Sequence, residues 1–286
     1  MSETAQPLVV WDFLTPRGVA AFAGARPGRL LLVQFVAALI AAGAVVWFIG
    51  NNCFPVIGTA IQKLPGSGEI NSGKLDWMGD SPESLAQGRF LALEVDLDHS
   101  GQINTSDLQI EFGRQSIRIF SLFGYMDFAY PQGYIIAFNR NELEPLWGAW
   151  AAELLLVSAA ATVIFLLLSW WLLAGVYVLP LRVFAFYTNR KLNFRQGWSM
   201  ASAALLPGAL LMTVAVLFYS VGLLNLLSFL FAFVAHFIVG WIYLFLSVIF
   251  IHPAPDVTTQ GNPFKTSGSR PADADNPFKK MHGAER

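Results

Sequence analysis

Residues 154–178 read LLLVSAAATVIFLLLSWWLLAGVYV, a run of 25 residues without a charged side chain. At about 1.5 Å of rise per residue, a helix of this length can cross the roughly 30 Å of hydrocarbon in a lipid bilayer. The composition of the whole chain agrees, because 55% of its residues are hydrophobic and only 13% are charged. A water-soluble domain has about one charged residue in four. The sequence therefore predicts a membrane protein.

Three further apolar runs cover residues 30–49, 198–221 and 223–251. Each is long enough to cross a bilayer as a helix, and Gly222 leaves room for only a tight turn between the last two. We therefore predict four transmembrane helices, the first at residues 30–49 and the other three within residues 147–251. The first is expected to be an uncleaved anchor, because 29 residues precede it and no small-residue cleavage site follows it.

The borders of the second transmembrane helix are marked by particular residues. Trp147, Trp150 and Glu153 precede the uncharged run, and Pro180 follows it. Trp is favoured at the interface between membrane and water, and proline interrupts a helix. This helix is expected to cross the membrane over residues 154–178 and to end at Pro180.

The charged residues predict the orientation of the chain. The short loop at residues 180–197 contains basic side chains and no acidic ones, whereas residues 50–146 contain twice as many acidic as basic residues. Lys and Arg near membrane helices favour the cytoplasmic side. The loop, the N-terminal arm (1–29) and the tail (252–286) are therefore expected in the cytoplasm, and residues 50–146 outside. The basic side chains of the loop are Arg182, Arg190, Lys191 and Arg195.

The two cytoplasmic ends have different compositions. Apolar residues between Leu8 and Phe22 predict a short interfacial helix on the inner leaflet, with a surface for a cytosolic partner as the alternative. The tail is rich in Pro, Asp, Thr, Gly and Ser, which predicts disorder. It repeats Asn-Pro-Phe-Lys at residues 262–265 and 276–279, either as a docking ligand or as simple turns.

The segment outside the membrane has the pattern of a sheet. Apolar residues alternate with polar or small ones over residues 91–95, 108–112 and 117–120. This alternation predicts antiparallel strands with one face exposed to water. Gly113, Arg114 and Gln115 are expected to form a hairpin turn. The predicted fold is a membrane α+β fold: four transmembrane helices with a small extracytoplasmic β-rich domain inserted between the first two. A domain of this size is only marginally stable alone, so docking on the bilayer or on a partner chain is expected.

An Asp-rich stretch in this domain is the strongest metal-binding signal. Residues 96–107 match much of an EF-hand calcium loop, in which Gly101 would make the sharp turn. The flanking strand pattern and the Asp at the last position favour the alternative, an Asp-rich turn after a strand. Calcium is the only cofactor that the sequence suggests. The expected ligands are Asp96, Asp98, Ser100, Gln102 and Asp107.

Two ionisable residues in or near the apolar runs are candidate functional groups, because charges at bilayer depth are costly. Glu153 is expected at the outer interface and His236 deep in the last helix, too far apart to touch. The alternative for His236 is a structural role, bonded to a backbone carbonyl or to a hydroxyl of Ser228, Thr213 or Ser158. The chain has no metalloprotease, serine-hydrolase or nucleotide-binding motif. We therefore expect no enzyme and no nucleic-acid partner.

Three stretches give the chain a family resemblance: Asp12–Arg17, Leu64–Leu75, and Arg190–Trp198 leading to Leu206-Pro207. With them the chain resembles the uncharacterised bacterial polytopic membrane proteins of domain of unknown function 1189, some of which are labelled as maltodextrin-utilisation proteins. The resemblance implies a bacterial plasma (inner) membrane location and a role beside transport or envelope processes. It implies no active-site residues.

The expected function is a non-enzymatic binding or scaffold accessory of a transport or envelope complex. Its expected partners are the lipid bilayer and either a membrane complex or further copies of the chain. The alternative is a small transporter or channel that uses Glu153, His236, Asn225 and a kink at Pro207.

Overall fold

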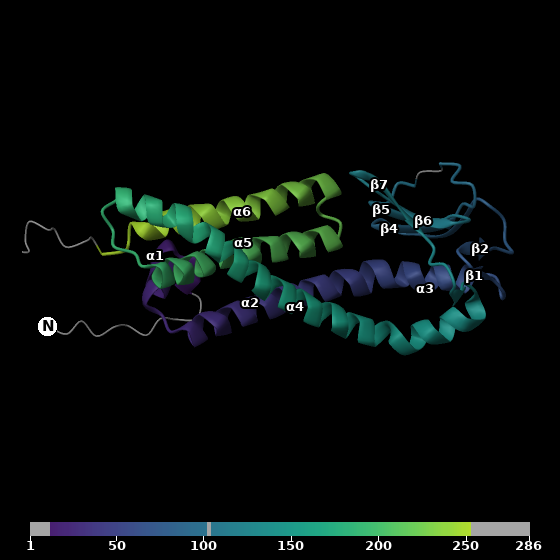
Figure 1. Ribbon diagram of the computed structural model, residues 1–286, viewed down its shortest axis with the longest axis horizontal. Coiled ribbons are helices and arrows are strands. Elements are labelled where there is room, and N and C mark those ends of the chain that lie inside the picture. The colour runs from purple at the N-terminus through teal and green to yellow at the C-terminus, as the bar shows by residue number, and fades with distance from the viewer. Residues whose placement is uncertain (1–11, 102–103, 253–286) are drawn as a thin grey trace, which may run out of the picture.

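A computed structural model describes residues 12–101 and 104–252. In these residues, four long apolar helices form a bundle, and two small β-sheets lie at one end of it (Figure 1). All four are long and apolar enough to cross a membrane. The predicted combination of four apolar helices with a β-rich domain is thus confirmed. The helices are α2 (Pro27–Phe48), α4 (Arg140–Tyr187), α5 (Phe194–Ser220) and α6 (Leu226–Val248).

Two of the helices extend past the predicted domain borders at residues 50 and 146. α2 continues through a turn of π-helix (Ile49–Cys53) into α3 (Phe54–Lys63), and α4 begins at Arg140. The two extensions pack on each other, with the rings of Phe54 and Trp147 4.8 Å apart. The strands therefore lie between α3 and α4 in the sequence. α3 and the start of α4 connect the sheets to the bundle.

α4 also continues past Pro180, where it was predicted to end. The last residues of the helix are held by tertiary packing, because Leu181 and Ala185 are fully buried in the helical core. This burial outweighs the local cost of a proline inside the helix.

α5 is the central helix of the bundle, and it contacts α2, α4 and α6. A capping box between Asn193 and Gln196 begins it. The predicted tight turn after it is present, with Gly222 at a φ of +81°, and the Asn225 side chain then caps the start of α6.

The described part of the N-terminal segment packs on the helix bundle. It consists of η1 (Asp12–Leu14), α1 (Pro16–Ala21) and η2 (Phe22–Gly24). Phe13, Val19 and Phe22 are at most 1% exposed in the same core as the long helices, because their apolar side chains fill the space beside α5 and α6. Residues 8–11, the 262–265 and 276–279 repeats and most of the tail lie outside the described residues.

In the described part of the outer domain, the strands form a three-stranded and a five-stranded sheet. The predicted strands and the hairpin at Gly113–Gln115 are present, but β4 and β5 pair in parallel, not antiparallel. The reason is that the chain is again beside the start of β4 when it enters β5, since the Asp107 N–H donates to the Arg89 carbonyl at 3.2 Å. The strands in sheet order are β2 (Lys74–Asp76), β1 (Glu69–Asn71) and β8 (Ile135–Ala137), then β3 (Glu83–Gln87), β4 (Leu91–Val95), β5 (Leu108–Phe112), β6 (Ser116–Ser121) and β7 (Gly124–Ala129).

Candidate functional site

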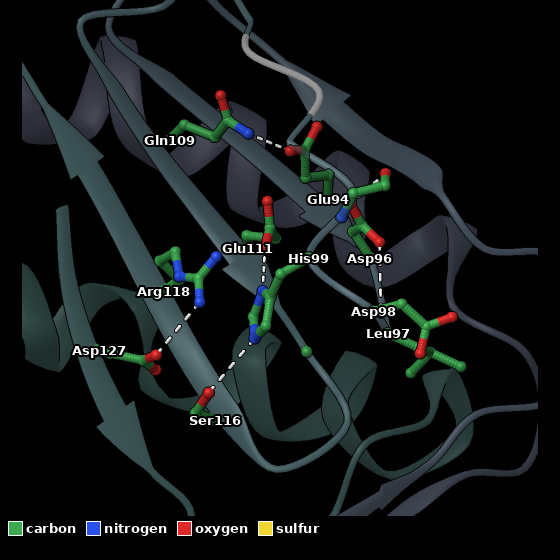
Figure 2. Close-up of polar contacts among 12 residues, drawn as sticks. Glu94, Asp96, Leu97, Asp98, His99, Gln109, Glu111, Ser116, Arg118 and Asp127 are labelled. Atoms are coloured by element: carbon green, nitrogen blue, oxygen red, sulfur yellow. Dashed lines mark hydrogen bonds and ion pairs between the residues drawn. The ribbon is translucent and has the colours of Figure 1, made fainter.

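A row of charged side chains crosses one face of the five-stranded sheet (Figure 2). The strand register places Glu94, Glu111, Arg118 and Asp127 next to one another on β4, β5, β6 and β7. The opposite face is apolar and packs on α3. Because side chains alternate between the two faces of a strand, the sequence pattern specifies both faces.

The segment between β4 and β5 covers this polar row. The His99 ring contacts the Glu111 carboxylate, and its Nε2 lies 3.3 Å from Ser116 Oγ (Figure 2). Asn104 Nδ2 donates to Glu94 Oε2 at 2.7 Å. Glu94 is therefore only 4% exposed and Glu111 is completely buried. Over β4 and β5, the face that was predicted to be exposed to water is thus covered by side chains of the connecting segment, whereas Asp127 on β7 is still 42% exposed.

Burial changes the protonation of this row. Desolvation and the charge of Glu111 raise the pKa of Glu94 to about 7, although hydrogen bonds from Gln109 and Asn104 oppose the shift. A hydrogen bond from Ser116, helped by Arg118, lowers the pKa of Asp127. The row can therefore hold a proton on Glu94 near neutral pH.

Two polar atoms of the row have no hydrogen-bond partner among the described residues: Glu111 Oε2 and Arg118 Nε. The two residues are directly opposite each other on β5 and β6. Arg118 instead bonds Asp127 at 3.3 Å and lies 4.8 Å from the Tyr125 ring centre. Buried, unpaired groups of this kind are costly in a protein interior.

Four of the five predicted calcium ligands lie among the described residues, and they have different surroundings. Asp96 accepts hydrogen bonds from the Ser100 backbone and hydroxyl at 2.6 Å each, in a turn that closes on itself. Burial alone would raise the pKa of Asp96, but these bonds outweigh it and lower the pKa. The Asp98 side chain is 81% exposed beside Arg114, and Gln102 lies outside the described residues.

The last predicted ligand, Asp107, faces the helix bundle: its Oδ2 accepts a 2.6 Å hydrogen bond from the Tyr219 hydroxyl on α5. In residues 12–101 and 104–252, no three His, Cys, Asp or Glu residues are grouped in a way that could hold a metal ion.

Tyr219 belongs to a junction between the outer domain and the bundle that the sequence did not reveal. The Phe90 ring lies 4.6 Å from Tyr219 and 5.2 Å from Phe48. Arg89 Nη2 donates to the Leu224 carbonyl at 2.8 Å. Nothing in the pattern around Arg89 and Phe90 marks them, because their partners are distant along the chain: Phe48 precedes them by about 40 residues, and Tyr219 and Leu224 follow them by more than 100.

The two candidate residues of the membrane helices are separate, as predicted. Glu153 is exposed on α4. His236 bonds the Phe233 carbonyl and lines a cavity of about 370 Å³ together with Thr162, Ser169 and Thr213. Each of these three hydroxyls donates to a carbonyl of its own helix, so the cavity presents a mainly apolar wall.

No protein-family model, curated protein or solved structure matches this chain.

Proposed function

We propose that this chain is a non-enzymatic, four-span protein of the bacterial plasma membrane, whose outer domain binds another protein as an accessory of a transport or envelope complex. The charge pattern supports the orientation, since the basic loop joins α4 to α5 at the end of the bundle that holds α1 (Figure 1). Both termini then lie in the cytoplasm. The same role is what the resemblance to the bacterial family implies.

The observation behind the binding role is the free edge strand β7. It is the last strand of the five-stranded sheet, and all six of its residues are exposed. Tyr125, Met126 and Phe128 are 62%, 58% and 50% exposed. Alternate residues of such a strand direct their backbone N–H and C=O groups away from the sheet.

Edge strands are usually protected from pairing by lysine, proline or a bulge. β7 has no Lys or Pro, and its one charge, Asp127, is paired with Arg118 at 3.3 Å. An apolar, unprotected edge is suited to strand addition, in which an extended segment of a partner pairs with the sheet.

An extended segment of a different protein fits this edge better than a second copy. Two copies in one membrane share an orientation, so a two-fold axis between them runs along the membrane normal. β7 runs away from the bundle, because its first residue, Gly124, is in register with the start of β4, where Phe90 contacts Tyr219. Two β7 strands would therefore meet in parallel, which is the less stable arrangement.

The test is a photo-reactive benzoylphenylalanine at Met126 in intact cells. We expect a crosslinked product whose peptide, identified by mass spectrometry, comes from another protein. Phe128→Lys adds a charge to the same face of β7 and is expected to reduce the product about tenfold, because lysine on an edge opposes strand pairing.

The matched control is Met78→Lys, since Met78 is 65% exposed but lies outside the five-stranded sheet. It should leave the product unchanged. A product formed only with a second copy of this chain, or equal yields from the two lysine variants, would contradict the proposal.

The bundle cavity favours a second candidate function, transport through the helices. His236 is the titratable residue in its wall, and the wall is otherwise mostly apolar, which suits an apolar solute better than an ion. If the chain transports such a solute, His236→Ala should abolish its flux into proteoliposomes while expression and thermal stability stay normal. Flux that is unchanged in this variant would remove the candidate.

A further inference from the structure

Two of the hairpin turns in the five-stranded sheet, β5–β6 and β6–β7, differ in character and lie at opposite ends of the sheet. The turn between β5 and β6 is Gly113-Arg114-Gln115, with both larger side chains exposed to solvent. The turn between β6 and β7 contains Leu122 and Phe123, which are 55% and 84% exposed. Two adjacent large apolar side chains at the tip of a hairpin are unusual on a surface that faces water.

The strand register shows which of the two turns faces the membrane. Leu91, Leu108, Ser121 and Gly124 form one row across β4, β5, β6 and β7. The residues just before this row on β4 and β5 are those that contact the outer ends of α5 and α6: Arg89 bonds the Leu224 carbonyl, and Asp107 bonds Tyr219. The Leu122–Phe123 tip extends from the same row, so it projects toward the bundle end (Figure 1).

The tip lies beside the start of α6. Leu122 lines a cavity of about 250 Å³ together with Leu226, the first residue of α6. Leu223 and Leu227, before and after it, are 71% and 55% exposed. In a helix that enters a bilayer at this point, such exposed leucines face lipid.

From these observations we infer that Leu122 and Phe123 insert into the outer leaflet, at the boundary between headgroups and acyl chains. The occupant of this surface is the lipid bilayer. The hairpin tip forms a second attachment of the outer domain, beside the Arg89 and Tyr219 junction. The tip and the junction together fix the tilt of the sheet relative to the membrane, and the β5–β6 turn remains in water.

The test uses the full chain, purified and reconstituted in vesicles of phosphatidylcholine and phosphatidylglycerol. Cys53 is the single cysteine, so a Cys53→Ser background accepts one label at a chosen site. An environment-sensitive nitrobenzoxadiazole label is placed on Phe123→Cys. Gln115→Cys is the matched control, an exposed residue in the other hairpin turn of the same sheet. Leu227→Cys is the lipid-facing reference.

We expect the label at position 123 to emit at shorter wavelength than the label at 115, and lipids with a spin label near the headgroup to quench it about twofold, as at an interfacial depth. Iodide in the water should quench the label at 115 only. If iodide quenches both turns equally, the tip lies in water and the inference is wrong. If the label at 123 is shielded from iodide but is not quenched by spin-labelled lipid, protein covers the tip, and the inference is also wrong.

The result is independent of the proposed binding role, because the vesicles contain no partner protein. The crosslinking test at β7 can fail while the label at 123 shows the lipid contact. The label can also show no lipid contact while the crosslinking test succeeds. A quenched label at 227, in a sample reconstituted in the same way, shows that the procedure inserts the helices.

Discussion

Replacement of Gly208 by alanine is expected to destabilise the helix bundle strongly. A Cβ atom on Gly208 would lie 2.3 Å from the carbonyl oxygen of His236 on α6, and the other nearby atoms are backbone atoms of the same residue. Backbone atoms cannot move away from the new Cβ atom as the end of a flexible side chain can. α5 and α6 must therefore move apart to relieve the clash. Overpacking of this kind costs about 1–3 kcal/mol or more, and glycine is what allows such a close approach of helices in a membrane.

Gly240→Ala is the matched control at the same interface. A Cβ atom at this position would meet Ala204 and Leu205 at 3.6 Å, which is ordinary van der Waals contact. Thermal unfolding of the full chain in detergent, followed by size-exclusion chromatography, should show a lowered midpoint for Gly208→Ala and little change for Gly240→Ala. Equal midpoints for the two variants would mean that α5 and α6 do not cross as closely as the structure has them.

Glu94→Gln is expected to stabilise the outer domain above neutral pH. In the native chain, the pKa of Glu94 is about 7 when folded, against an ordinary value of 4.5. Between these values the folded state holds a proton that the unfolded state has lost, so the free energy of unfolding falls as pH rises. It is highest below about pH 4.5 and has reached its lower level above about pH 7.

The shift corresponds to about 3 kcal/mol in the free energy of unfolding. Glutamine keeps the shape of a protonated glutamate, and the Asn104 amide can turn to accept from it. Glu94→Gln should therefore remove the pH dependence between pH 4.5 and 7 and leave a domain that is more stable by about this amount at pH 8.

Pulse proteolysis of the outer domain in urea, on the full chain in detergent, measures this free energy at each pH. Glu144→Gln is the control, because that carboxylate is 47% exposed and should keep the native slope. If Glu94→Gln unfolds more easily at pH 8 than the native chain, then the Glu94 carboxylate stabilises the sheet as an anion, contrary to the structure.

Local pattern was enough to predict the main elements. The apolar runs marked the four helices, alternation marked the strands around Leu93 and Ile110, and Gly222 marked the tight turn. These features depend on residues close together in the chain, whose periodicity is visible in the sequence.

The features that were missed depend on contacts between distant residues. Strand alternation showed that Glu94 and Glu111 share a face, but it could not show that His99 and Asn104 would fold back over that face. In the same way, the sequence of residues 54–63 ends in polar residues and does not show that this helix packs on the sheet through Ala60. Parallel pairing of β4 with β5 follows from the same crossing segment.

The length of α4 has a consequence for how the two ends of the molecule are connected. Its 48 residues correspond to about 70 Å at the rise of an α-helix, more than twice the thickness of the hydrocarbon layer. One end of this helix lies beside the sheets and the other at the basic loop. In the proposed orientation, one continuous helix thus connects the sheets outside the membrane with the loop in the cytoplasm.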